Sequence, residues 1–307
     1  MGLGRKWRGL AGVGRRRRLG AAAVLAAASV LLTAAPSSGS GTAPLGHPLD
    51  PARFARGACV VFAPIGGRAR ATVFIDAGHG GPDPGAVGVT LGGRSVHEAD
   101  ETVRVALDAL APLRAAGFRV VLSRTGAGAV ARPAPGDLDG GLFTAQGVHR
   151  DLVARDACAN RARAAVLIGV YFNANDSPAA AGGLTLYDAA RPFWRKSLRL
   201  ARLVQDEVLA SLRAAGAGVP DDGVHTDVGY GSSVSAADQA YGHLLILGPA
   251  KRGYFSAPSR MPGALIEPLF ITDPAEASRA ASRRGQMSIA RGLARAVERY
   301  FGPPAAG

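Results

Sequence analysis

Short runs of β-branched and other apolar residues alternate along this chain with longer segments in which apolar residues recur at helical spacing. The runs predict strands at 71–76, 119–123, 166–171, 243–247 and 264–270, and the longer segments predict helices at 98–115, 151–165, 192–215 and 273–301. Such alternation is typical of a mostly parallel sheet with helices on both faces. The sequence therefore predicts an α/β fold, a three-layer sandwich with a largely parallel central sheet.

Residues 1–35 have the pattern of an export signal. Basic residues up to Arg18 are followed by an uncharged apolar run from 19 to 35, which ends on the small residues Thr33, Ala34 and Ala35. The apolar run is also close to the length of a membrane-spanning helix, so an uncleaved anchor is an alternative to a cleaved signal peptide. We expect a secreted or cell-envelope protein that touches the membrane only through this segment.

The remaining chain divides by composition. Residues 36–69 are predicted to form a linker and lead-in, which is rich in Pro, Gly and Ala at first. Residues 70–302 are long enough for one catalytic domain, and we expect the protein to be a monomer. The formal net charge is +13, but the first eighteen residues contribute seven positive charges and no negative one. The rest is only moderately basic, which argues against a nucleic-acid partner.

The chain has two cysteines, Cys59 and Cys158, too few for a disulfide-rich scaffold or a zinc site built from cysteine clusters. An oxidising compartment would allow them to pair. Cys158, however, lies in a helical pattern, where a lone core thiol is the more common use of cysteine. The sequence thus favours unpaired thiols.

Polar residues follow the predicted strands at positions where a parallel sheet places its ligand site. His79 follows the first strand, Glu98 opens the next helix, Tyr171 ends the third strand, and Glu267 lies in the last. Histidine and carboxylate can hold Zn²⁺, and a further glutamate can pass a proton from water to a leaving amine.

Each residue also has a structural explanation. His79 lies among glycines and can simply belong to a tight turn, whereas Ser95 and Glu98 have the spacing of a capping box. His97 and Glu98 are adjacent on a helix, so only one of the two is expected to face the site. Glu267 is harder to explain structurally, because a carboxylate in an apolar strand needs a cleft or a partner.

Several ordered motifs carry a family resemblance. They are residues 73–81, the helix from Glu98 that stops at Gly117, and segments 119–124, 155–160, 182–184, 262–274 and 286–301. From about residue 70 to 301 the chain resembles the zinc-dependent N-acetylmuramoyl-L-alanine amidases (the Amidase_3 class). The resemblance implies an amidase fold, peptidoglycan as partner, and cleavage between N-acetylmuramic acid and the L-alanine of the stem peptide. It also implies that His79 and Glu98 are zinc ligands and that Glu267 is the catalytic residue.

The third ligand departs from the family pattern. Residues 169–173 correspond to the family's Ser-Ile-His-Ala-Asn, which places Tyr171 where a histidine is expected and keeps Asn173 in register as a candidate substrate-binding residue. Replacement ligands are the Tyr171 phenolate, Asn173, Asp176, His225 or His243, although His243, at the start of a predicted strand, is better explained as a core or rim residue.

Two hypotheses follow from the matched site residues and the altered third-ligand position. One is a peptidoglycan amidase with an altered metal site. The alternative is a non-catalytic relative that keeps the fold and binds wall fragments as a regulator. Retention of both His79 and Glu267 favours the enzyme, since a binding protein needs no proton-transfer group. A different metallohydrolase on the same scaffold is a third interpretation, because fold does not determine substrate.

Overall fold

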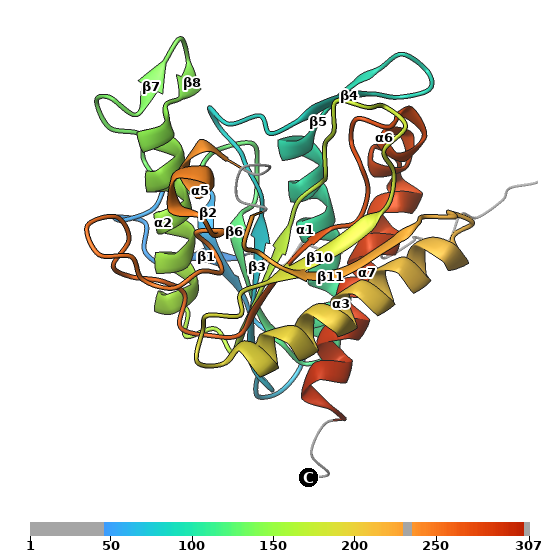
Figure 1. The fold of residues 1–307 in the computed structure, drawn as a ribbon. Helices are drawn as coiled ribbons and strands as arrows, with labels where there is room; N and C mark the ends of the chain where they lie inside the picture. Colours follow the sequence, from blue (N-terminus) through green and yellow to red (C-terminus); the bar gives the residue numbers. More distant parts are fainter. Residues whose placement is uncertain (1–45, 230–234, 304–307) are drawn as a thin grey trace, which may run out of the picture. The chain divides into compact units, whose positions relative to one another are not determined.

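The computed structural model describes residues 46–229 and 235–303. Residues 1–35, predicted as signal peptide or anchor, lie outside the described residues. An eight-stranded sheet has the order β1-β2-β6-β3-β9-β12-β10-β11 (Figure 1). Its strands are β1 (His47–Pro48), β2 (Ala58–Phe62), β3 (Thr72–Ala77), β6 (Arg119–Arg124), β9 (Val166–Val170), β10 (Gly183–Tyr187), β11 (Asp221–Thr226) and β12 (Gly263–Glu267).

The centre of the sheet is parallel. β6, β3, β9 and β12 all run in one direction, β2 is antiparallel to β6, and β10 is antiparallel to β12 and parallel to β11. The long helices are α1 (Glu98–Ala115), α2 (Ala145–Arg161), α3 (Trp194–Ala214) and α7 (Arg283–Phe301). The carboxyl ends of β3, β9 and β12 therefore meet at one edge, whereas β10 and β11 end at the opposite edge.

Two buried clusters cover the two faces of this sheet. Val73 and Ile75 of β3 pack with α1, α3 and α7, and Phe74 between them packs with α2 on the other face. This is the alternation expected of a strand buried on both sides. The predicted α/β sandwich with a largely parallel sheet is confirmed. Within the described ranges, no helix has the length and apolar character needed to cross a membrane.

Several element boundaries differ from the sequence prediction. The predicted strand 243–247 is wrong: this buried segment forms turns, and β10 occupies the sheet position beside β12. β10, β11 and β2 are strands that periodicity did not reveal. The second helix begins at Ala145 rather than at 151, because the Thr144 side chain caps it by accepting a hydrogen bond from Gly147 N at 3.2 Å.

Short elements complete the fold. The last predicted helix is divided into α6 (Pro274–Ala280) and α7, each with its own cap, from Asp273 and Ser282 respectively. The segment between β6 and α2 contains the hairpin of β7 (Leu138–Asp139) and β8 (Leu142–Phe143). A second hairpin joins β4 (Val87–Val89) and β5 (Ser95–His97), and α5 spans Ala236–Tyr241.

The expectation of unpaired thiols is wrong. Cys59 of β2 and Cys158 of α2 form a disulfide, with their Cα atoms 5.7 Å apart. Both cysteines are fully buried in the cluster that covers the α2 face of the sheet. The sequence prediction failed because it lacked β2, the strand that brings Cys59 beneath α2.

We expect the disulfide to contribute substantially to stability, because it closes a loop with a sequence separation of 99 residues. In the chain-entropy model such a crosslink is worth roughly 4–5 kcal/mol. The double variant Cys59→Ser, Cys158→Ser should therefore lower the free energy of unfolding by about that amount, measured by chemical denaturation. Equal stability of variant and wild type would contradict this contribution.

Candidate active site

The loop after β3 places His79 over the carboxyl edge of the sheet. His79 has a φ of 59°, in the left-handed region, and the next two glycines also have positive φ. The buried Arg155 side chain holds this turn by donating hydrogen bonds to Ala77 O at 2.7 Å and His79 O at 2.5 Å. A buried cation on α2 thus fixes the backbone that carries the candidate ligand.

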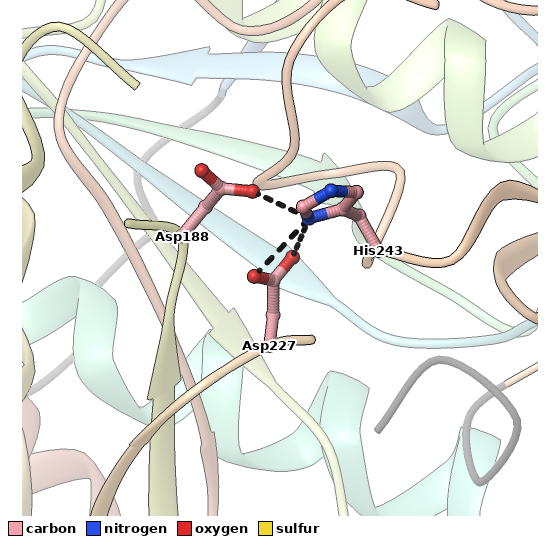
Figure 2. Close-up of side chains that lie close together, drawn as sticks. All are labelled: Asp188, Asp227 and His243. Atoms are coloured by element: carbon pink, nitrogen blue, oxygen red, sulfur yellow. Dashed lines mark hydrogen bonds and ion pairs between the residues drawn. The ribbon is translucent and has the colours of Figure 1, made fainter. Parts of the chain in front are cut away.

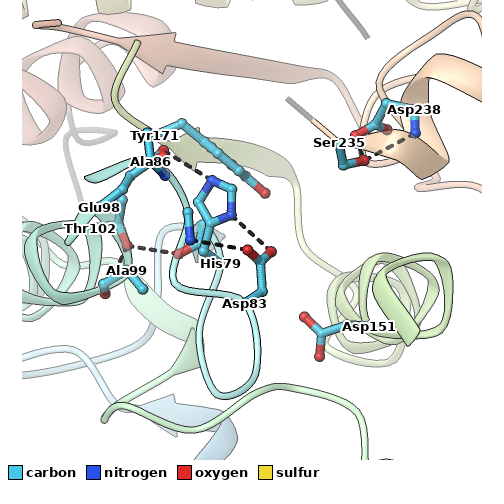
Figure 3. A network of polar contacts seen from close by, with 12 residues as sticks. His79, Asp83, Ala86, Glu98, Ala99, Thr102, Asp151, Tyr171, Ser235 and Asp238 are labelled. Atoms are coloured by element: carbon cyan, nitrogen blue, oxygen red, sulfur yellow. Dashed lines mark hydrogen bonds and ion pairs between the residues drawn. The ribbon is translucent and has the colours of Figure 1, made fainter. Parts of the chain in front are cut away.

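His79 lies between two carboxylates (Figure 3). Its Nε2 is 3.1 Å from Glu98 Oε1, and its Nδ1 is 2.8 Å from Asp83 Oδ2. The histidine and Glu98 are 8% and 3% exposed. The structure thus brings His79 and Glu98 together in a site that is largely closed to solvent.

Glu98 does not form the capping box. Its Oε2 accepts a hydrogen bond from Ala86 N at 2.9 Å, and its Oε1 accepts one from Phe172 N at 2.8 Å. The N-cap of α1 is His97, which is exposed and makes no side-chain cap, and Ser95 belongs to β5. The carboxylate of Glu98 is thus oriented by backbone amides from two other segments.

The electrostatics of this pair favour a positive charge. Burial by itself lowers the pKa of His79, but attraction by Glu98 and hydrogen bonds with Asp83 and Glu98 outweigh burial and raise the pKa from 6.5 to about 10. Asp83 is only partly buried. Its partial burial raises its pKa, but the hydrogen bond and ion pair with His79 outweigh that effect and lower the pKa of the aspartate. The site stabilises a proton on His79, or another cation in its place.

Glu267 ends β12 and lines a cavity of about 240 Å³ with His79, Glu98, Phe172 and Ala174. The glutamate is 5% exposed. Burial, together with repulsion from Glu98, raises the pKa of Glu267 from 4.5 to about 8, against the opposing attraction of His79. A carboxyl with such a pKa can accept and release a proton near neutral pH.

The Tyr171 ring lies beside His79, and its hydroxyl is directed toward Asp76. The two rings meet edge to face with their centroids 5.2 Å apart, and the tyrosine hydroxyl donates a hydrogen bond to Asp76 Oδ2 at 3.0 Å. Asp76 in turn accepts a hydrogen bond from Arg155 at 2.8 Å. Burial, and then Asp76, raise the pKa of Tyr171 well above 10 in spite of Arg155. The hydroxyl is therefore protonated and engaged in a buried network.

The other candidate replacements do not line the cavity shared by His79, Glu98 and Glu267. The Asn173 side chain accepts a hydrogen bond from Ala174 N, and Asp176 is exposed in the loop beyond it. His225 is in β11, with Nε2 2.6 Å from Asp222 O. His243 lies with Asp188 and Asp227, which follow β10 and β11 at the opposite edge of the sheet.

Sequence reasoning missed Asp83. This carboxylate stands four residues after His79 in the same glycine-rich loop, and its Oδ1 also accepts a hydrogen bond from Gly85 N at 3.0 Å. A carboxylate close in sequence to a candidate histidine ligand is a detectable signal, because metal-binding histidines commonly donate their other ring N–H to one.

The chain is similar to known cell-wall amidases. The sequence profile described as N-acetylmuramoyl-L-alanine amidase (Amidase_3) matches residues 73–299. The germination-specific N-acetylmuramoyl-L-alanine amidase of Bacillus subtilis is 26% identical over 233 residues, which cover 75% of this chain and 79% of the relative.

Solved amidase structures share the fold. The amidase AmiC2 of Nostoc punctiforme aligns with a TM-score of 0.52 at 23% identity, covering 76% of this chain and 98% of its own. The CwlD amidase of Clostridioides difficile, solved with the GerS lipoprotein, aligns with a TM-score of 0.55 at 19% identity, covering 75% and 98%. With the profile spanning most of the chain and the site at the expected sheet edge, the protein belongs to the N-acetylmuramoyl-L-alanine amidase family.

Proposed function

We propose that the protein hydrolyses peptidoglycan at the amide between N-acetylmuramic acid and the L-alanine of the stem peptide, with Glu267 as the catalytic residue. The single observation that carries this proposal is the buried Glu267 carboxyl, which lines one cavity with His79 and Glu98. A binding surface gains nothing from a buried carboxyl held near neutral pKa. A proton-transfer catalyst requires one.

The reaction assigns two proton transfers to Glu267. As a base, it takes a proton from the water that attacks the amide carbon. As an acid, it returns that proton to the alanine nitrogen when the C–N bond breaks, which leaves a free carboxyl on the lactyl group and a free amine on the stem peptide. Because the pKa of Glu267 is raised to about 8, both protonation states are accessible near neutral pH.

His79 and Glu98 are the residues that would hold zinc. Two ligands about 2.05 Å from a tetrahedral zinc lie about 3.3 Å apart, and His79 Nε2 and Glu98 Oε1 are 3.1 Å apart. When bound, the metal polarises the carbonyl and lowers the pKa of water. The fit is partial, since the Tyr171 hydroxyl is engaged with Asp76. Catalytic zinc usually has three protein ligands, so we expect weak zinc binding here.

That partial fit favours one alternative, a non-catalytic wall-binding regulator. The two functions are separated by incubating the full-length chain with cell-wall sacculi, with and without added zinc. Release of stem peptides bearing a new N-terminal alanine supports the amidase. Binding to sacculi without any release, at every zinc concentration tested, would refute it in favour of the regulator.

Asp83 is expected to tune zinc binding through His79. Because its carboxylate accepts the Nδ1–H of His79, it holds the ring with Nε2 toward Glu98. Losing such a partner typically lowers metal affinity by about 10–100-fold. The variant Asp83→Asn should show that loss in a zinc titration with a competing chelator, whereas Asp100→Asn on the exposed side of α1 should not. Unchanged affinity in Asp83→Asn would contradict this role.

We also propose that residues 1–35 export the protein, cleaved or retained as an anchor, and that residues 70–302 form the catalytic domain of a monomer in the cell envelope. The order of basic, apolar and small residues at the N-terminus supports export. Cell fractionation tests it: full-length protein found only in the soluble cytoplasmic fraction would contradict export.

A further inference from the structure

Three ligand-type side chains converge at the sheet edge opposite His79 and Glu98. Asp188 follows β10, Asp227 follows β11, and His243 lies two residues beyond α5 (Figure 2). His243 Nδ1 is 2.9 Å from Asp188 Oδ2 and 3.4 Å from Asp227 Oδ2. Across residues 46–229 and 235–303, this is the one group of three His, Cys, Asp or Glu residues whose ligand atoms all lie within 4.8 Å of one another.

Both carboxylates are removed from water, since Asp188 is 1% and Asp227 0% exposed. Asp188 Oδ1 accepts a hydrogen bond from Ala190 N, and Asp227 Oδ2 accepts one from Leu244 N. Asp188 Oδ2 is different: it is buried, points into the group, and accepts no hydrogen bond, despite its short distance to the ring nitrogen. A single Nδ1–H cannot satisfy the oxygens that face it.

The nearby Arg191 side chain does not donate a hydrogen bond to the unsatisfied Asp188 oxygen. Burial lowers the pKa of Arg191. The nearby carboxylates of Asp156 and Asp188 oppose this shift but do not cancel it. Its guanidinium donates hydrogen bonds to the backbone oxygens of Leu247, Gly248 and Ser259. Burial and repulsion from Asp188 raise the pKa of Asp227 to about 7, against hydrogen bonding and the attraction of His243. The two carboxylates therefore face each other across one imidazole at an electrostatic cost.

We propose that Asp188, Asp227 and His243 bind a divalent transition-metal ion, with zinc the best match. One imidazole nitrogen with two carboxylate oxygens is a mixed donor set that suits zinc, whereas calcium and magnesium prefer oxygen alone. The separations of 2.9 and 3.4 Å bracket the roughly 3.3 Å expected between two ligands of a tetrahedral zinc. His243 is 24% exposed, which leaves an access route for the ion and for a water ligand.

The ion would join three segments that are distant in sequence. It links the ends of β10 and β11 to the residue that follows α5, and thereby anchors α5. Ser235 and Asp238, at the start of α5, line a cavity with His79 and Asp83. The metal would therefore have a structural role. Its binding would stabilise α5, which contributes to the wall of the cavity beside His79, and it would supply no catalytic group.

A zinc count in a background that lacks the His79 and Glu98 donors tests this proposal. The full-length chain carrying His79→Ala and Glu98→Ala is stripped with a chelator and titrated with zinc against a chromophoric competitor. We expect one equivalent of bound zinc. Adding His243→Gln should remove that equivalent, and adding His97→Gln, at an exposed histidine, should leave it unchanged.

A second measurement covers the case in which His243→Gln fails to fold. In the same background, Asp188→Asn keeps the side-chain shape and should lose the zinc-induced rise in melting temperature that the background protein shows and that magnesium does not produce. Cobalt in place of zinc should give visible d–d absorption that Asp188→Asn abolishes. No bound zinc in the background protein, or one equivalent that survives His243→Gln and Asp188→Asn alike, would overturn the proposal.

Discussion

Replacing Glu267 with glutamine is expected to lower the rate of stem-peptide release by a factor of ~10²–10⁴, the usual cost of losing a positioned proton-transfer group. Glutamine has nearly the same shape as glutamate, so the cavity beside His79 and Glu98 keeps its lining. The amide, however, cannot take a proton from water. Zinc content should not fall, because the residue is not one of the two proposed ligands. The measurement is dye release from labelled sacculi, alongside metal analysis of the same samples.

The same variant carries a thermodynamic signature. A carboxyl whose pKa rises from 4.5 unfolded to about 8 folded favours the folded state only while it is protonated. Its contribution is complete below about pH 4.5 and is lost as the pH rises to about 8. In metal-free protein, the melting temperature of the wild type should therefore fall relative to Glu267→Gln across this window.

A matched control makes both readouts specific. Glu298 is an exposed glutamate on α7, far along the chain from the site elements. The variant Glu298→Gln should match the wild type in activity and in the pH dependence of melting. Turnover in Glu267→Gln equal to that of Glu298→Gln would show that Glu267 is not the proton-transfer group.

The sequence predicted the parts of the fold that depend on local pattern. The strands that became β3, β6, β9 and β12 are buried on both faces, so their apolar runs were nearly continuous and easy to recognise. Because parallel strands end at one edge, the positions of His79, Glu98 and Glu267 could be predicted to converge. In the structure the three side chains line one cavity.

Features that depend on tertiary partners were not predictable in this way. Residues 243–247 have the composition of a strand, but they fill a buried turn that is held by the Leu244 N hydrogen bond to Asp227. The disulfide depends on β2, a short strand in a segment that looked like a lead-in. Asp83 acts through its orientation toward His79, which no periodicity reveals.

The role of Tyr171 is likewise decided by a distant residue. In sequence, a tyrosine at the position of a third ligand offers either a phenolate or a missing donor. In the structure, its hydroxyl donates to Asp76, which Arg155 of α2 also contacts, and its ring covers Gly78, where a Cβ atom would lie 2.5 Å from the ring. The residue thus has a structural function that a histidine would not reproduce.

Replacing Tyr171 with histidine is accordingly expected to raise zinc affinity while lowering stability. Neutral imidazole binds zinc without the cost of deprotonating a phenol, and it would add a third donor to His79 and Glu98. Groups that only orient a ligand change metal affinity by about 10–100-fold, so a whole added ligand should give at least that gain. Asp76 loses a buried hydrogen bond, which should cost about 1–3 kcal/mol.

Tyr171→Phe is the matched control for this experiment, because it removes the same hydroxyl and adds no donor. It should show the loss of stability without any gain in zinc affinity. Both variants and the wild type are titrated with zinc against a competing chelator and assayed on sacculi. If Glu267 is correctly oriented, amidase activity rises with zinc occupancy in Tyr171→His alone. If instead the wild type binds one zinc tightly at His79 and Glu98 and the histidine variant gains nothing, then Tyr171 or a neighbour such as Asp176 completes the site, and the two-ligand interpretation is wrong.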